Sequence, residues 1–107
     1  MGFFNSITVK NKANNICSLF LELERLINSS RGVNDNNYFS VTSTISKIES
    51  EYGYMQEPLF DMGRNRYSLT LKWTDGRNYP LHEWEGCVKL SLGQAKLLVN
   101  KHHQTYK

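Results

Sequence analysis

Apolar residues recur at steps of three and four in the first third of the chain. The positions concerned are Ile16, Leu19, Phe20, Leu23, Leu26 and Ile27. This spacing is typical of an amphipathic helix with one face on a core, and it predicts a helix over residues 12–29. Gly32 and the polar residues before it favour a helix end, followed by a polar loop over residues 32–37. Residues 1–11 are expected to form an N-terminal arm or a short edge strand.

Residues 38–52 are compatible with two patterns. Their content of valine, threonine and isoleucine favours a strand, and this is the interpretation that we prefer. A helix stays open as an alternative, because apolar residues also recur there at helical spacing. These residues are Val41, Ile45, Ile48 and Tyr52. Gly53, Pro58 and Gly63 interrupt both patterns, so residues 53–63 are expected to form a loop.

Apolar and polar residues alternate strictly between residues 66 and 74. The apolar positions are Tyr67, Leu69, Leu71 and Trp73. A period of two predicts a half-buried antiparallel strand over residues 66–74. Asp75-Gly76 is a strong turn signal, after which residues 77–84 are expected to return as a strand that Pro80 interrupts. A second turn at Glu85-Gly86 then leads into a third strand over residues 87–92 and a helix over residues 94–103.

These elements predict one small α+β domain over residues 1–107. It would contain an N-terminal amphipathic helix, an antiparallel β-meander of three to four strands, and a C-terminal helix packed on one sheet face. A chain of 107 residues is long enough to bury a core without disulfides or metals. Two cysteines are too few for a disulfide framework, and no apolar run is long enough to span a membrane. The sequence therefore indicates a cytoplasmic protein.

Charge is distributed unequally between the two halves. Residues 64–107 contain eight Lys/Arg and three Asp/Glu, a balance of +5, whereas residues 1–63 contain five and seven, a balance of −2. Such asymmetry points to an anionic partner. Eleven asparagines against two alanines suggest an AT-rich source such as a phage or a plasmid.

The expected sheet would gather cations on its open face. Arg66, Lys72 and Lys89 alternate with core positions, and Arg64 and Arg77 lie at the strand ends. Hydroxyl residues share this face: Ser68, Thr70, Thr74 and Ser91. Cations and hydroxyls together suit phosphate contacts, although a solvated charged face would show the same pattern.

The aromatic residues divide into two groups. Tyr67 and Trp73 alternate with leucines and are expected in the core. Tyr79 and Trp84 lie in the irregular return strand, where they would either stack on bases or cover the edge of the core.

Catalytic and metal-binding motifs are not evident. His82 and Cys87 are five residues apart and His102 is adjacent to His103, so the spacings typical of zinc ligands do not occur. A Cys87–His82 pair would need a third, orienting group for nucleophilic catalysis, and none is suggested. We expect no cofactor, no metal and no enzymatic activity.

Three segments of the second half carry a family resemblance. They are Gly63-Arg64-Asn65-Arg66-Tyr67 running on to Trp73, Gly76-Arg77-Asn78-Tyr79 with His82-Glu83-Trp84, and Gly86-Cys87-Val88-Lys89-Leu90-Ser91-Leu92 followed by residues 94–99. Together they resemble the transcriptional positive-cofactor (coactivator) family of single-stranded-DNA-binding domains, which has a β-β-β-β-α unit. Pro80 and the N-terminal helix depart from the family pattern.

The resemblance implies a dimer that binds single strands on its basic sheet face. It implies phosphate contacts by Arg64, Arg66, Lys72, Arg77 and Lys89, and base stacking by Tyr79 or Trp84. The leading hypothesis is thus a small non-enzymatic nucleic-acid-binding protein. The alternative is a phage- or plasmid-type inhibitor or immunity protein that binds another protein. Its interface would be acidic residues of the first half: Glu22, Glu24, Glu49, Glu51, Glu57 and Asp61.

Overall fold

The computed structural model describes residues 2–105, most of which are helical. Three long helices are α1 (Gly2–Ser29), α2 (Tyr38–Asp61) and α3 (Leu81–Thr105). Between α2 and α3 lie a 3-10 helix, η1 (Gly63–Ser68), and two strands, β1 (Thr70–Lys72) and β2 (Asn78–Pro80). No helix in this range is long and apolar enough to cross a membrane.

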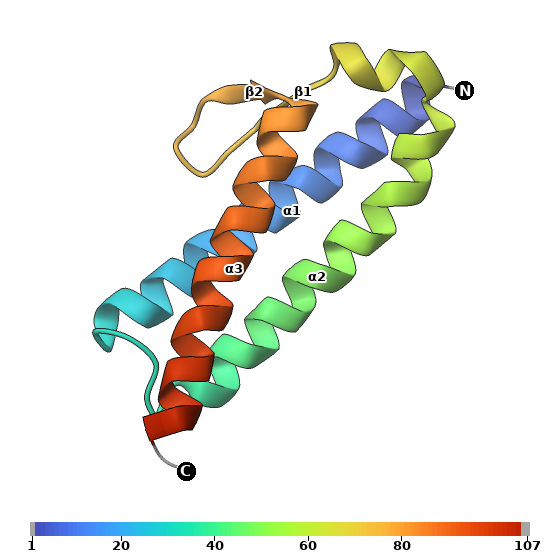
Figure 1. The fold of residues 1–107 in the computed structure, drawn as a ribbon. Helices are drawn as coiled ribbons and strands as arrows, with labels where there is room; N and C mark the ends of the chain where they lie inside the picture. Colours follow the sequence, from blue (N-terminus) through green and yellow to red (C-terminus); the bar gives the residue numbers. More distant parts are fainter. Residues whose placement is uncertain (1, 106–107) are drawn as a thin grey trace.

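The helices form an elongated bundle of about 50 × 23 × 17 Å (Figure 1). α1 and α2 run antiparallel beside each other, and α3 runs along this pair from the hairpin end to the α1–α2 turn. η1 and the β1–β2 hairpin lie together at the end where α1 begins. The hairpin is antiparallel and pairs Leu71 with Tyr79.

The core lies between the inner faces of the three helices and under the hairpin. Its largest fully buried side chains are Trp84, Ile16, Ile48, Met55, Leu71, Val9, Val41 and Val88. Each helix contributes residues at three- and four-residue steps, as an amphipathic helix packed on one face should.

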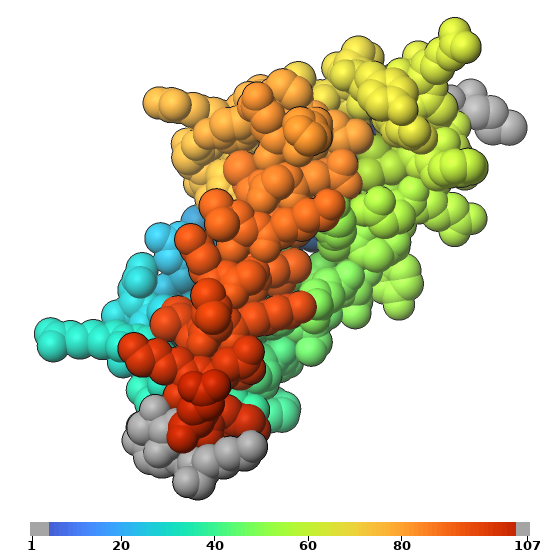
Figure 2. All heavy atoms as spheres, viewed as in Figure 1, coloured from blue at the N-terminus to red at the C-terminus, as the bar shows by residue number. Residues whose placement is uncertain are grey.

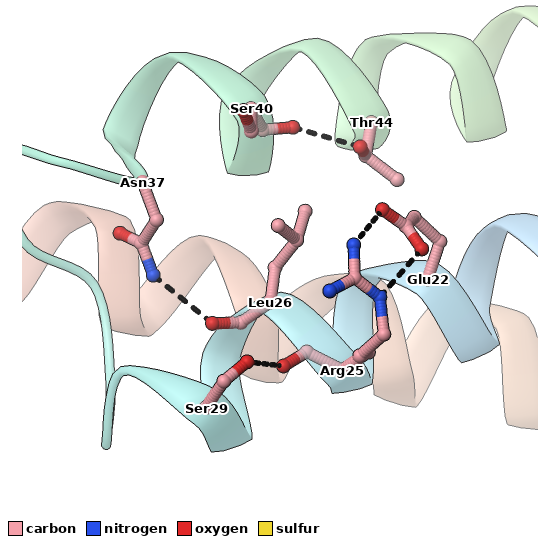
Figure 3. Close-up of polar contacts among 7 residues, drawn as sticks. All are labelled: Glu22, Arg25, Leu26, Ser29, Asn37, Ser40 and Thr44. Carbon is pink, nitrogen blue, oxygen red and sulfur yellow. Dashed lines mark hydrogen bonds and ion pairs between the residues drawn. The ribbon is translucent and has the colours of Figure 1, made fainter.

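The α1–α2 turn is held by backbone and side-chain hydrogen bonds. Arg31 has φ 54° and the Gly32 N–H bonds to the Ile27 carbonyl at 2.8 Å, which ends α1 in a left-handed cap. The side chain of Asn37 is buried, and its amide nitrogen donates to the carbonyls of Leu26 and Gly32 (Figure 3 shows the bond to Leu26). α2 starts directly after this residue, so one side chain fixes the end of one helix to the start of the next.

The predicted meander of three to four strands is wrong, because the sheet among residues 2–105 has only two strands of three residues each. Residues 38–52, which we expected as a strand, are helical, and the loop expected over residues 53–63 continues as helix to Asp61. The buried stripe of α2 consists of Val41, Thr44, Ile45, Ile48, Met55 and Leu59. Packing of this stripe against α1 outweighs the strand preference of its β-branched residues.

In the second half of the chain, too, segments that were predicted as strands or turns are mostly helical. Residues 66–74 divide into the end of η1 and the short β1, and both the turn expected at Glu85-Gly86 and the strand expected over 87–92 lie inside α3. The inward face of α3 has helical spacing: Leu81, Trp84, Val88, Leu92, Ala95 and Val99. Residues 60–99 therefore do not form the four-stranded unit that the family resemblance implies.

Several sequence predictions are confirmed. Residues 12–29 and 94–103 are helical, the loop over residues 32–37 is present, and the chain reverses at Asp75-Gly76. The helices are longer than predicted, since α1 already includes residues 2–11, which are therefore neither a strand nor an arm. The return strand is confined to Asn78–Pro80, with the proline at its end.

Candidate binding sites at the hairpin end

The five cations predicted to share a sheet face lie on three different elements. Arg64 and Arg66 are in η1, Lys72 is in β1, Arg77 is in the hairpin turn, and Lys89 is in α3. Lys72 lines a pocket against α1, whereas Arg66 lines a different cleft between η1, α2 and α3. The structure does not gather these cations on one face.

The predicted aromatic roles are partly reversed. Trp84, a candidate for base stacking, is completely buried, whereas Tyr67, which we expected in the core, is 73% exposed. Trp73 packs on the core, and the centre of its ring lies 5.2 Å from the ring centre of Phe20 and 6.0 Å from that of Trp84. Tyr79 is half-buried and donates its hydroxyl to Asp75 within the hairpin. The carboxylate beside it raises the pKa of this hydroxyl.

A cleft of about 690 Å³ lies at this end of the molecule, and we call it the end cleft. Its lining residues are Gln56, Glu57, Leu59 and Phe60 of α2, Arg66 and Tyr67 of η1, Pro80 of β2, and Leu81, His82 and Glu85 of α3. The end cleft forms because α2 ends at Asp61 and the chain turns at Gly63, where φ is +59°, so that η1 leads back toward α3.

The end cleft has an apolar floor and an aromatic rim. Leu59 and Leu81 are 4% and 8% exposed and belong to the core. Phe60 and Tyr67, by contrast, expose 76% and 73% of their surface. The cleft thus combines buried leucines with two aromatic rings that the rest of the protein leaves uncovered.

Polar contacts hold the walls of the end cleft. The Arg66 guanidinium lies 4.9 Å from the centre of the Tyr67 ring and donates a hydrogen bond to its hydroxyl. On the opposite wall, the Tyr52 hydroxyl donates to Glu85 at 2.6 Å. The pKa of Tyr52 is raised well above its ordinary value. Burial is the main cause, and the Glu85 carboxylate is the second. Glu85 is thereby fixed in position beside His82 on the first turns of α3.

Sequence reasoning missed Phe60 and misplaced Tyr67. Phe60 was assigned to a loop, although extending the helical stripe of α2 through Met55 and Leu59 would have placed it on the outer face. Tyr67 was predicted in the core because it fits the alternation of a strand. The sequence of η1 contains no feature that distinguishes this 3-10 helix from a strand.

A second, more polar hollow lies between α1 and the hairpin. Lys10 and Asn14 of α1 and Lys72 and Asn78 of the two strands line it, above Ala13 and Leu71. Thr70 also lines this hollow, so all five polar side chains can donate hydrogen bonds, and two of them carry a positive charge. We call this hollow the lysine–asparagine pocket.

The acidic residues of the first half are largely occupied by internal contacts. Glu22 binds Arg25 one turn along α1, Glu51 lies 3.1 Å from Lys12, and Glu49 lies 2.6 Å from Lys96 of α3 (Figure 3 shows the Glu22 contact). Glu57 lines the end cleft and Glu24 lines a groove between α1 and α3. Three of the six acidic residues are therefore engaged in ion pairs within the chain.

Metal coordination is not supported by the side chains in the described part of the chain, where no three His, Cys, Asp or Glu residues gather. Comparison with known proteins adds no functional assignment. No protein-family model matches the chain, and searches of the curated proteins and of the solved structures found no match.

Proposed function

We propose that this protein acts by binding another protein, and that the end cleft receives a segment of its partner. The observation that carries the proposal is the pair of exposed rings, Phe60 and Tyr67, above a floor of buried leucines. Aromatic and arginine side chains around an apolar pocket are the usual composition of an interface centre. Binding to another protein was the alternative hypothesis drawn from the sequence, with acidic residues of the first half as the interface. Here the proposed interface is the end cleft instead.

Exposure of these two rings is costly unless a partner covers them. Burying a phenylalanine side chain stabilises a protein by roughly 1.5–3 kcal/mol, and this chain forgoes most of that at Phe60. Isolated exposed apolar residues are common on protein surfaces. Two such rings lining one cleft, with an arginine against one of them, are better explained by a contact surface.

A protein segment suits the end cleft better than a nucleic acid does. Glu57 and Glu85 line the same cleft as Arg66, so an incoming phosphate would meet two carboxylates. A peptide can place an apolar side chain between the rings and polar groups on the rim.

Photo-crosslinking tests the proposal directly. p-Benzoylphenylalanine placed at Tyr67 or Phe60 should join the protein to one partner in cells that express it. The same probe at Phe39 is a matched control, because this ring is 81% exposed but lies at the start of α2, at the other end of the molecule. The identified partner should then bind the purified protein, and Phe60→Ala should weaken binding by about tenfold or more.

Two results would count against the proposal. One is crosslinking at Phe39 as strong as at Tyr67, which would indicate non-specific capture. The other is a partner whose affinity is unchanged by Phe60→Ala and Tyr67→Ala. Loss of folding is not expected for either variant, since substitutions at exposed sites usually change stability by less than about 0.5 kcal/mol.

Nucleic-acid binding is the second candidate, and it is supported by the lysine–asparagine pocket. Lys10 and Lys72 supply charge there, and Asn14 and Asn78 supply amide donors, without a carboxylate among the lining residues. Fluorescence anisotropy with labelled single- and double-stranded oligonucleotides at about 50 mM salt tests it. Binding should be weakened by Lys10→Ala and Lys72→Ala and left unchanged by Arg66→Ala, and its absence at low salt would rule the candidate out.

A further inference from the structure

The outer face of α3 carries an uncovered apolar stripe. Its members alternate at steps of four and three residues: Gly86, Leu90, Gly93 and Leu97. Leu90 and Leu97 expose 64% and 69% of their surface, and both glycines are exposed. Figure 2 shows α3 running along the front of the bundle with its outer side uncovered. Steps of four and three are the spacing of a helix-to-helix seam.

The two glycines are not explained within one copy of the chain. A Cβ added at Gly86 or Gly93 would meet nothing within 4 Å, and neither residue has a positive φ. Glycine inside a helix is less stable than alanine because it loses more backbone freedom. Its advantage is that another backbone or a large side chain can approach closely at that position.

We infer that α3 binds α3 of a second copy of this chain in an antiparallel pair. A two-fold axis between residues 91 and 92 places Leu90 opposite the partner's Gly93, and Leu97 opposite the partner's Gly86. Each leucine then fills the space that a glycine leaves. A parallel pair would instead place leucine on leucine and glycine on glycine, which leaves gaps at two levels.

Charges at the ends of the stripe support the antiparallel orientation. By helical spacing, Glu83 and Lys101 lie on the same flank of α3. The antiparallel pair sets Glu83 of each copy beside Lys101 of the other, which gives two symmetric ion pairs. On the opposite flank Lys89 approaches the partner's Lys96, a like-charge contact that weakens the pair, because the exposed Lys96–Glu49 ion pair at 2.6 Å neutralises Lys96 only in part.

The contact is small, so the pair should be weak. The stripe covers 12 residues, or roughly 18 Å of helix, and contains only two exposed leucines, so it buries less surface than the roughly 800 Å² that each partner contributes to a standard interface. We therefore expect dissociation constants in the range of tens to hundreds of micromolar, on the order of the weakest specific complexes. This inference rests on the outer face of α3 and uses none of the observations that support the proposed function.

Sedimentation equilibrium of the full chain up to about 500 μM measures the pair. The wild-type protein should dimerise reversibly, and Leu90→Ala with Leu97→Ala should weaken the dimer by about tenfold or more. Leu21→Ala is the matched control, because Leu21 is a 49% exposed leucine on α1 and should change nothing. A monomer at all concentrations, or a dimer indifferent to both α3 leucines, would overturn the inference.

Two further variants test the contact and its orientation. Gly93→Ala should weaken the dimer and yet raise the urea midpoint of the monomer, because it adds a methyl group to the seam and a better helix former to α3. Lys89→Glu should tighten an antiparallel dimer, and this gain should fade at high salt, because position 89 faces the partner's Lys96. A dimer that Gly93→Ala strengthens, or that Lys89→Glu leaves unchanged, contradicts the proposed pairing.

Discussion

The indole Nε1 of Trp84 donates a hydrogen bond to the backbone carbonyl of Lys72 at 2.9 Å, which joins α3 to β1. The thiol of Cys17 donates to the same oxygen, also at 2.9 Å. One carbonyl therefore fastens the hairpin to both α1 and α3. Burial raises the pKa of this thiol, so it stays protonated and keeps donating at neutral pH.

Trp84→Phe should destabilise the protein by roughly 1–3 kcal/mol, because it removes one donor from a partly buried hydrogen bond and part of a fully buried ring. Urea unfolding followed by circular dichroism measures this change. Lys72→Ala is the control, since it keeps the carbonyl and removes only an exposed side chain, and it should cost less than about 0.5 kcal/mol. Equal costs for the two substitutions would show that the hydrogen bond does not matter.

The Tyr52–Glu85 contact should contribute to the free energy of unfolding, and this contribution should be lost at high pH. The pKa of Tyr52 is raised in the folded protein, whereas an unfolded tyrosine loses its proton near pH 10. The folded state then holds a proton that the unfolded state has lost, so the free energy of unfolding falls as pH rises above about 10. Below that pH the contribution is fully present.

Tyr52→Phe tests this sign. The variant should be less stable than the wild type at neutral pH, and the difference should narrow as pH rises above about 10, because only the wild type can lose this term. Urea unfolding at several pH values measures both proteins. Groups that titrate in the same range, such as Tyr79, are common to both and cancel in the difference. Parallel stability curves would refute the assignment.

The sequence predicted the helices over residues 12–29 and 94–103, whereas α2 and the first half of α3 were mistaken for strands and turns, for a physical reason that Leu90 illustrates. Val88 and Leu92 are four residues apart, so the alternation of Val88, Leu90 and Leu92 also suits a helix that buries two of them and exposes the third. Short apolar runs do not distinguish the two periods. The inward series that starts at Leu81 and Trp84 and ends at Val99 would have done so over a longer window.

The candidate site was harder to predict than the helices, because it depends on how separate elements meet. Phe60 and Tyr67 line one cleft only because the chain turns at Gly63, after the end of α2, and η1 leads it back. Nothing local in the sequence distinguishes these exposed rings from the buried Trp84. Charge composition was equally uninformative, since cations of the basic half are spread over η1, the hairpin and α3.

Two glycines, one inside α2 and one just after its end, should respond to alanine with stability changes of opposite sign. Gly53 lies inside the helix and a Cβ there would meet nothing within 4 Å, so Gly53→Ala should stabilise the protein by about 0.5–1 kcal/mol. Gly63 has φ +59° at the end of the helix, so Gly63→Ala should destabilise it by about 1 kcal/mol. Thermal unfolding of both variants measures the pair. Changes of the same sign would mean that α2 does not end as described.

The buried side chain of Asn37 should contribute more to stability than any other asparagine of the α1–α2 turn. Its amide nitrogen donates to Leu26 and Gly32, and its oxygen accepts from the Asn34 N–H at 2.8 Å. Asn37→Ala leaves these three backbone groups without that partner in a mostly buried position and should cost about 2–3 kcal/mol. Asn36→Ala, at the exposed neighbouring position, is the control and should cost less than about 0.5 kcal/mol. Urea unfolding decides the matter, and an Asn37 variant as stable as the Asn36 variant would mean that the turn is held by its backbone alone.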